Sequence, residues 1–117
     1  MRNEPFRKAL VDSVVPTHLQ PGLLRWIEEG IRPGGFLSSV LANDLIGAAA
    51  RADELSLVGL PILAKFLVQH APNGSYGSPK ALKNWPDFIV AQNRRDADFT
   101  SWTVGTVLRE LTERDVK

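Results

Sequence analysis

Cysteine is absent from this chain, which excludes disulfide bonds, cysteine-ligated metal or iron–sulfur sites and thiol nucleophiles. Long hydrophobic runs are absent as well. The most apolar window, residues 57–68, is about a dozen residues long and contains Lys65, so it is too short to cross a bilayer. Near the start, Asp12 interrupts the one short apolar run, so no signal peptide is predicted. We therefore expect a cytoplasmic protein without a membrane partner.

Net charge is also nearly absent: fourteen basic and thirteen acidic residues give +1 at pH 7. Domains that bind duplex DNA usually present a strong positive field, so duplex DNA is not an expected partner. The charge is unevenly distributed, because residues 65–95 contain five basic residues and one acidic residue. An anionic partner is therefore expected to meet this segment first.

The length of 117 residues fits one ordinary domain, and an apolar fraction of 44% argues against disorder. Proline and glycine turns divide the chain into segments with helical periodicity, and no segment shows the alternation typical of a strand. We predict a single all-α domain over residues 1–117 with five or six helices. The expected helices are residues 6–15, 21–29, 36–51 and 54–70, one over 79–95 that Pro86 divides into 79–85 and 87–95, and one that begins at Asp98 or Thr100.

The second of these helices has a clear stop signal in Gly30. Its polar face places charged residues four positions apart, which predicts outward ion pairs between Arg25 and Glu29 and between Glu28 and Arg32. This pattern is typical of an amphipathic helix at the surface.

The segment 36–51 shows the longest helical pattern. Ser39, Asn43 and Gly47, each four residues apart, form a stripe of small side chains along it. Such a stripe suits close packing against another helix, either within the chain or in an oligomer.

The segment 54–70 is apolar almost all round, which predicts a central helix, and Asp53 is placed to cap it. Pro61 lies inside it and predicts a kink, or a true start nearer Gly59. In the same way, Pro86 predicts that the helix beginning at residue 79 breaks or restarts after Trp85.

No constellation for catalysis or metal binding is readable. The two histidines, His18 and His70, lie far apart and outside any spacing typical of a metal site. The Gly-Ser-Tyr-Gly turn at residues 74–77 is one residue short of a nucleophile elbow and follows no predicted strand. Glycine motifs of the Walker and Rossmann types are absent. We therefore expect a protein that is not an enzyme and that uses no metal or cofactor.

Two glycine-containing turns open directly into predicted helices and are the candidate ligand sites. Glycine lets the backbone approach a ligand closely, and a helix N-terminus presents unpaired N–H groups, so each turn suits a phosphate or carboxylate. The candidate residues of the first turn are Gly34, Gly35, Phe36 and Ser38. Those of the second are Ser75, Tyr76, Gly77, Ser78 and Lys80, with Trp85 as a stacking face and Arg94 or Arg95 as counter-charges.

A purely structural interpretation competes with this one, because Pro-Gly and Asn-Gly turns with serine caps connect the helices of most small helical proteins. The three tryptophans are similarly ambiguous. Core packing explains Trp26, Trp85 and Trp102 most simply, and a partner surface explains one of them nearly as well.

The turns and helix faces between residues 16 and 85 resemble those of a group of small proteins encoded by phages and prophages. The resemblance rests on Gly-Ile-x-Pro-Gly-Gly-Phe-Leu at residues 30–37, Asn-Asp-Leu at 43–45 and Arg-Ala-Asp at 51–53. Residues 86–117 extend beyond it as a C-terminal helical extension. The resemblance implies a regulator of host machinery in a bacterial cell, which counters immunity by docking on a host protein or by removing a nucleotide signal.

These observations favour a non-catalytic, homo-oligomeric binding protein that sequesters a small anionic ligand, such as a nucleotide immune signal. Bulky replacements of Gly35 or Gly77 are then expected to abolish binding with little loss of helicity. One alternative is a protein–protein inhibitor or adaptor that uses Trp26, Trp102 and a helix face. Another is a nucleic-acid-binding regulator, which the basic segment permits and the near-neutral total charge disfavours.

Overall fold

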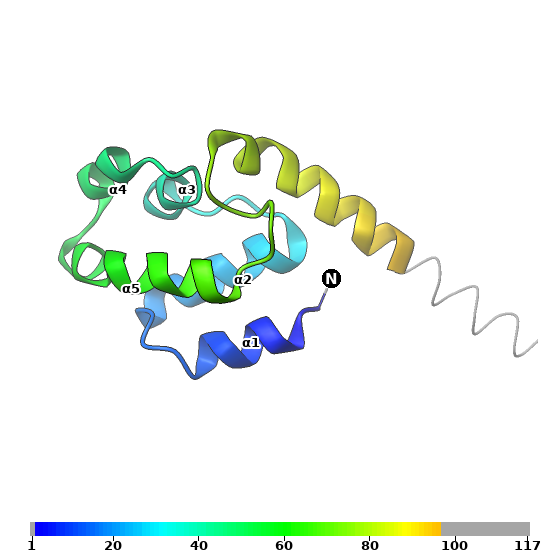
Figure 1. The fold of residues 1–117 in the computed structure, drawn as a ribbon, viewed down its shortest axis with the longest axis horizontal. Coiled ribbons are helices and arrows are strands. Elements are labelled where there is room, and N and C mark those ends of the chain that lie inside the picture. The colour runs from blue at the N-terminus through cyan, green and yellow to red at the C-terminus, as the bar shows by residue number, and fades with distance from the viewer. Residues whose placement is uncertain (1, 97–117) are drawn as a thin grey trace, which may run out of the picture.

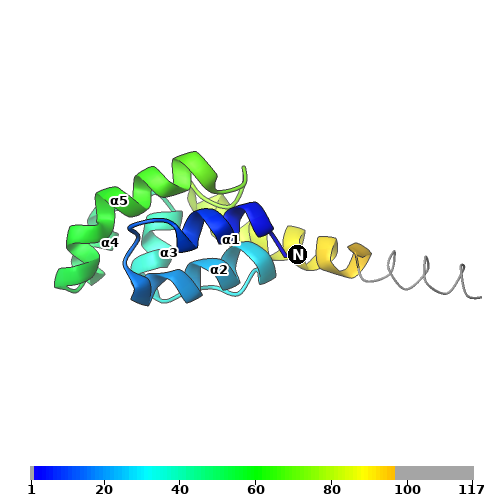
Figure 2. The ribbon, with the colours of Figure 1, turned by 90° about the horizontal axis from the view of Figure 1, so that it is seen from below.

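The computed structural model describes residues 2–96, and every regular element within them is a helix, which confirms the all-α prediction. The elements are α1 (Glu4–Val11), a 3-10 helix η1 (Thr17–Leu19), α2 (Gln20–Glu29), α3 (Gly35–Leu41), α4 (Leu45–Arg51), α5 (Glu54–His70) and a helix over residues 79–96. Helix α1 lies beside α2 and α5, whereas α3 packs on α4 (Figures 1 and 2). The predicted last helix and Trp102 lie outside the described residues.

The first two α-helices have local end signals. Helix α1 begins two residues before the predicted range of 6–15 and ends four residues before its end. Asn3 caps α1, since its side-chain oxygen accepts a hydrogen bond from the N–H of Phe6 at 3.2 Å. Helix α2 ends at Gly30, whose φ of 70° is left-handed, as predicted. A Cβ on Gly30 would lie 2.9 Å from Cα of Pro86 and 2.5 Å from Cγ2 of Ile89. Glycine at this position therefore also lets the last described helix approach α2.

The prediction of one continuous helix over residues 36–51 is wrong, because the chain divides this segment into α3 and α4. Asn43 adopts a φ of 63°, a left-handed conformation that asparagine tolerates and that interrupts a helix. Asp44 then caps α4, its Oδ1 accepting from the N–H of Gly47 at 2.9 Å. The break places Ser39 on α3 and Gly47 on α4, so the predicted stripe of small residues is not one helix face.

Two internal prolines lie inside continuous helices. Helix α5 begins at Glu54 and contains Pro61, so the alternative start near Gly59 is wrong. The helix over residues 79–96 likewise continues through Pro86, and the predicted break there is wrong. Both helices keep burying side chains against the core beyond their prolines. This burial offsets the backbone hydrogen bond that each proline removes.

Trp26 lies at the centre of the core and is fully buried. Its indole N–H donates to the carbonyl of Ser75 at 2.9 Å, and the indole N–H of Trp85 donates to the carbonyl of Trp26 at the same distance. Both tryptophans are therefore core residues, as the core-packing interpretation predicts. The buried position of Trp26 also removes it from the partner surface that the docking hypothesis requires.

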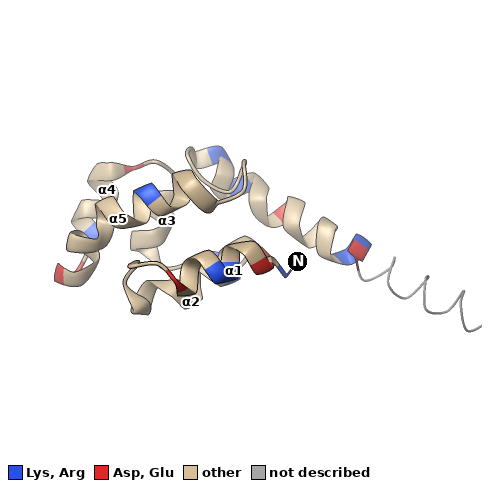
Figure 3. Cartoon of the chain, turned by 60° about the horizontal axis from the view of Figure 1, so that its bottom comes forward, with Lys and Arg blue, Asp and Glu red and all other residues tan. Residues whose placement is uncertain are grey.

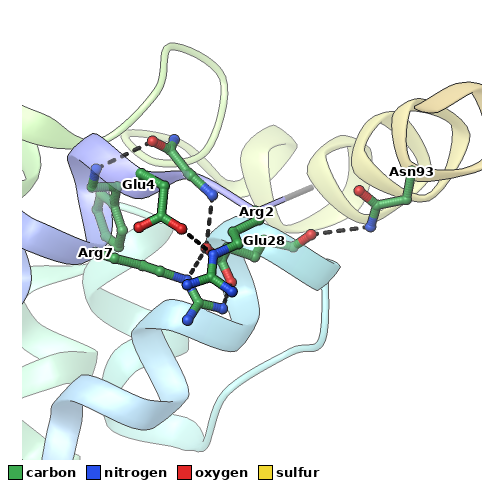
Figure 4. A network of polar contacts seen from close by, with 7 residues as sticks. Arg2, Glu4, Arg7, Glu28 and Asn93 are labelled. Atoms are coloured by element: carbon green, nitrogen blue, oxygen red, sulfur yellow. Dashed lines mark hydrogen bonds and ion pairs between the residues drawn. The ribbon is translucent and has the colours of Figure 1, made fainter. Parts of the chain in front are cut away.

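Glu28 is a buried carboxylate that holds α1 on α2 (Figure 4). Nε and Nη2 of Arg7 donate to its two oxygens at 2.6 and 2.5 Å, and the N–H of Asn3 donates at 2.8 Å. The hydrogen bonds from Arg7, together with the one from Asn3, hold the pKa of Glu28 below its usual range. The predicted Glu28–Arg32 pair is wrong, since Arg32 instead donates to the carbonyl of Leu82 at 3.1 Å.

Candidate functional site: an arginine-lined cleft

A cleft of about 670 Å³ opens where the start of α2, the turn before α3 and the junction of α4 with α5 meet. Its volume lies within the range of small-ligand pockets. Its lining includes Gly34, Gly35 and Phe36 of the first predicted turn. The other walls come from segments far apart in the sequence, so folding and not a single motif creates the cleft.

Arginine side chains give the cleft its charge. Arg25 on α2, Arg32 in the connection after it and Arg51 at the end of α4 all line it, and His18 adds an imidazole. Asp53 is the one carboxylate in the lining. None of the three arginines forms an ion pair with another residue in the part of the chain that the structure describes. The positive charge of the cleft is therefore largely uncompensated.

Gly35 provides the space that Arg51 occupies. A Cβ on Gly35 would lie 3.0 Å from Cδ of Arg51 and 3.4 Å from its Nε, so this side chain crosses the turn directly over the glycine. Nη1 of Arg51 donates to Oγ of Ser39 and to the carbonyl of Gly47, both at 3.2 Å. The glycine selected from the sequence as a ligand cradle thus positions an arginine of the cleft.

Gly34 faces the open side of the cleft. It is the N-cap of α3, its backbone is extended, and a Cβ built on it meets no atom within 4 Å. No side chain caps α3. Oγ of Ser38 donates to the carbonyl of Pro33 at 3.0 Å and closes the turn, and Phe36 is half-buried against the core. Ser38 is not part of the cleft lining, whereas Gly34, Gly35 and Phe36 are.

His18, Ser56 and Asp53 lie together at one end of the cleft. Nε2 of His18 lies 3.0 Å from Oγ of Ser56 and 4.0 Å from Oδ2 of Asp53. The backbone N–H of Ser56 donates to Oδ1 of Asp53 at 2.7 Å, and this bond, with one from the serine hydroxyl, lowers the pKa of Asp53. Both contacts of the imidazole use the same nitrogen, whereas a hydrolytic triad needs the ring to bridge serine and carboxylate through its two nitrogens. The group is the N-cap of α5 with a histidine against it.

The second predicted turn does not meet the first. Ser75 is fully buried; its Oγ donates to the carbonyl of Pro72 at 2.6 Å, and its own carbonyl accepts from a core indole. The N–H of Gly77 donates to the carbonyl of Leu41 at 2.7 Å. These polar groups thus bond within the protein, and none of them lines the arginine-rich cleft.

The remaining candidate residues are spread over the surface and the core. Trp85 is buried, Tyr76 packs partly buried against the core, and Ser78 directly precedes the helix over residues 79–96. Their positions leave them outside the lining of the cleft.

The predicted counter-charges are exposed on the helix over residues 79–96. Lys80 lies near its beginning and Arg94 fourteen residues later, which at 1.5 Å per residue separates them by about 21 Å. Arg95 donates to Oε1 of Gln92 at 3.0 Å. The structure does not gather these three cations into one site.

Sequence reasoning missed the arginines of the cleft as functional candidates. The sequence predicts surface ion pairs for Arg25 and Arg32, and neither pair forms in the described part of the chain. Arg51 appears in the sequence analysis only within the Arg-Ala-Asp motif at residues 51–53. No spacing rule joins all three residues, because α3 and most of α4 lie between Arg32 and Arg51 along the chain.

Within residues 2–96, no group of three histidine, aspartate or glutamate side chains could hold a metal ion, and no helix is long and apolar enough to cross a membrane. Comparison of the chain with protein-family models, curated proteins and solved structures finds no match. The cleft is therefore the main indication of what this protein binds.

Proposed function

We propose that this protein is a non-catalytic binding protein for a small anionic ligand and that the arginine-lined cleft is its binding site. The observation that carries the proposal is the convergence of Arg25, Arg32 and Arg51 on one cleft. A guanidinium group presents five N–H donors in a planar fork that matches two phosphate or carboxylate oxygens. Three such groups in a cleft of this size favour a multiply charged ligand.

The apolar part of the cleft narrows the ligand class. Phe36 and Ile31 both line it, and Ile31, which follows Gly30 at the end of α2, is 51% exposed. An apolar wall beside guanidinium groups suits a ligand that combines phosphates with a flat ring. A nucleotide has this combination, so we take nucleotide phosphates as the ligand class.

The resemblance to phage proteins adds the biological setting of the proposal. In that setting the ligand is a nucleotide signal of bacterial immunity, and the protein lowers its free concentration by binding it. The effect of such a protein depends on its affinity for the ligand and on its own concentration. It needs positively charged hydrogen-bond donors in a pocket and no nucleophile. The arginines that line the cleft are such donors.

Substitution of Gly34 gives a sharp test, because the site is open and the residue caps α3. Asn and Asp are nearly equal in size, and both are better N-caps than glycine, so G34N and G34D should fold as well as the wild type. They differ by one negative charge in the cleft. Calorimetric titration with adenosine triphosphate, pyrophosphate and cyclic dinucleotides should show affinity within about threefold of wild type for G34N and about tenfold or more weaker for G34D.

Native mass spectrometry of the protein purified from bacteria identifies the physiological ligand. A nucleotide-sized mass that is present in the wild type and reduced in G34D supports the proposal. Equal affinity of G34N and G34D would place binding elsewhere on the surface. A protein that carries no added mass and gives no heat with any of the probes would contradict the proposed function.

A further inference from the structure

Helix α5 has an apolar outer face that the described part of the chain leaves uncovered. Its inner face is buried through Ser56, Gly59, Leu63, Phe66 and Leu67. Five large apolar side chains on its other faces are 37–76% exposed, and they are Leu55, Leu57, Val58, Ile62 and Val68. The sequence predicted a central helix, whereas the structure places this helix at the surface. Figure 3 shows how little of α5 is charged.

The exposed surface continues onto α4. Leu45 and Ile46 are 64% and 79% exposed. A groove between the two helices is lined by both Leu45 and Pro61, so the patches of α4 and α5 meet. The exposed apolar side chains of the two helices thus form one patch, which is a common mark of an interaction site on a protein surface.

The charges on the outer face of α5 show which partner fits. Glu54, Val58, Pro61 and Lys65 follow one another at intervals of four, three and four residues, so they form one stripe along the helix. All four are exposed. Neither Glu54 nor Lys65 forms an ion pair with another residue among those described. From its first residue to its last, the stripe therefore consists of an acidic residue, two apolar residues and a basic residue.

We propose that this face of α5 binds the same face of a second copy, with the two helices antiparallel about a two-fold axis. The axis passes between Val58 and Pro61. Glu54 of each copy then lies opposite Lys65 of the other, so the ion pair forms twice. A parallel arrangement would instead place like charges opposite each other, so the order of the stripe selects the antiparallel dimer.

The surroundings of the stripe suit helix packing. A groove between α1 and α5 runs along one side and contains Val14 and Ile62, and the groove with Leu45 runs along the other side. Pro61 borders both grooves. Side chains beside the stripe of one copy can enter the grooves of the other, which is the usual way in which two helices pack.

The dimer lies apart from the proposed ligand cleft, since none of the four stripe residues lines that cleft. The inference therefore stands or fails independently of the proposed function. It also gives the predicted homo-oligomer a specific interface, in place of the stripe of small residues that the break at Asn43 divides.

Sedimentation equilibrium of the full chain tests the dimer. The wild type should show a concentration-dependent species of twice the 12.9 kDa chain mass. V58E introduces a charge at the centre of the interface and should weaken association about tenfold or more. The matched control is V11E, because Val11 and Val58 are both 76% exposed and Val11 lies on α1. The control should leave association unchanged, and circular dichroism should show that both variants are folded.

Charge reversal tests the register. K65E places two carboxylates opposite each other and should weaken the dimer about tenfold, whereas E54K combined with K65E should restore an affinity within about threefold of the wild type. A wild type that is monomeric at 100 μM, as expected if residues 97–117 or another protein cover the face, overturns the proposal. So does a dimer that V58E leaves intact, or a charge reversal that the double variant fails to rescue.

Discussion

The indole nitrogen of Trp85 lies 2.9 Å from the carbonyl oxygen of Trp26 and donates a hydrogen bond to it. The same carbonyl also accepts from the N–H of Gly30 at 3.0 Å. The indole N–H of Trp26 donates to the carbonyl of Ser75, which has no second donor among the described residues. The two indoles thus connect α2, the loop after α5 and the last described helix, and they should make unequal contributions to stability.

Phenylalanine at each tryptophan position should separate these contributions. Trp26→Phe leaves the carbonyl of Ser75 unpaired and removes volume from the core, which should cost about 2–3 kcal/mol. Trp85→Phe should cost about 1 kcal/mol, because the carbonyl of Trp26 keeps the N–H of Gly30. Urea unfolding followed by circular dichroism measures both values. Equal costs would contradict this ranking.

Gly30 and Gly34 should respond oppositely to alanine. Gly30 has a positive φ, and a Cβ there would lie 2.9 Å from the backbone of Pro86, so Gly30→Ala should destabilise the protein by about 2 kcal/mol or more. A Cβ on Gly34 meets open space, and the backbone conformation suits any residue. Gly34→Ala should therefore change the free energy of unfolding by less than about 0.5 kcal/mol. Thermal melts of the two variants provide the comparison.

Glu28 should make stability depend on pH in the acid range. Its pKa is lowered in the folded state, chiefly by the hydrogen bonds from Arg7, so its contribution is complete above the unfolded-state pKa of about 4.3 and is lost as the pH falls through the lower folded value. Glu28→Gln should flatten the decline in stability below about pH 5. The exposed neighbour Glu29 is the matched control, and Glu29→Gln should retain the decline. Urea unfolding between pH 2 and 7 compares the three proteins.

Asp44 should stabilise the start of α4 through its bond to the N–H of Gly47. Asp44→Ala should cost about 1 kcal/mol, and Asp44→Asn, which keeps an accepting oxygen, should cost less than half of that. Chemical unfolding distinguishes the two variants. If both cost the same, the hydrogen bond is not the source of the stabilisation.

The structure also changes how glycine variants in the two turns should be interpreted. A side chain on Gly77 meets no atom within 4 Å, but its φ of 100° strains any other residue, so loss of binding in such a variant could follow from a disturbed loop. Gly35→Ala instead displaces Arg51, since the new Cβ would lie 3.0 Å from its Cδ. If Gly35→Ala lowers the affinity for the ligand and leaves the helicity unchanged, Arg51 contributes to ligand binding.

Local signals in the sequence predicted much of the secondary structure. The stop at Gly30 and the cap of α5 by Asp53 are found as expected, because each depends on a few neighbouring residues. The break at Asn43 was missed, although asparagine followed by aspartate can form a left-handed turn and a cap in succession. The left-handed turn at Asn43 and the cap at Asp44 end the helix there, although the apolar periodicity continues across them.

By itself, the sequence determined that the described chain is helical, both ends of α2 and α5 to within one residue, and that no cysteine chemistry is available. These properties depend on composition and on contacts within one or two turns. Only the tertiary structure decided which charges meet. It placed Arg7 on Glu28, gathered three arginines around the turn at Gly34, and left the outer face of α5 exposed. Residues distant in the chain meet according to the packing of whole helices, and periodicity identifies an apolar face without identifying what covers it.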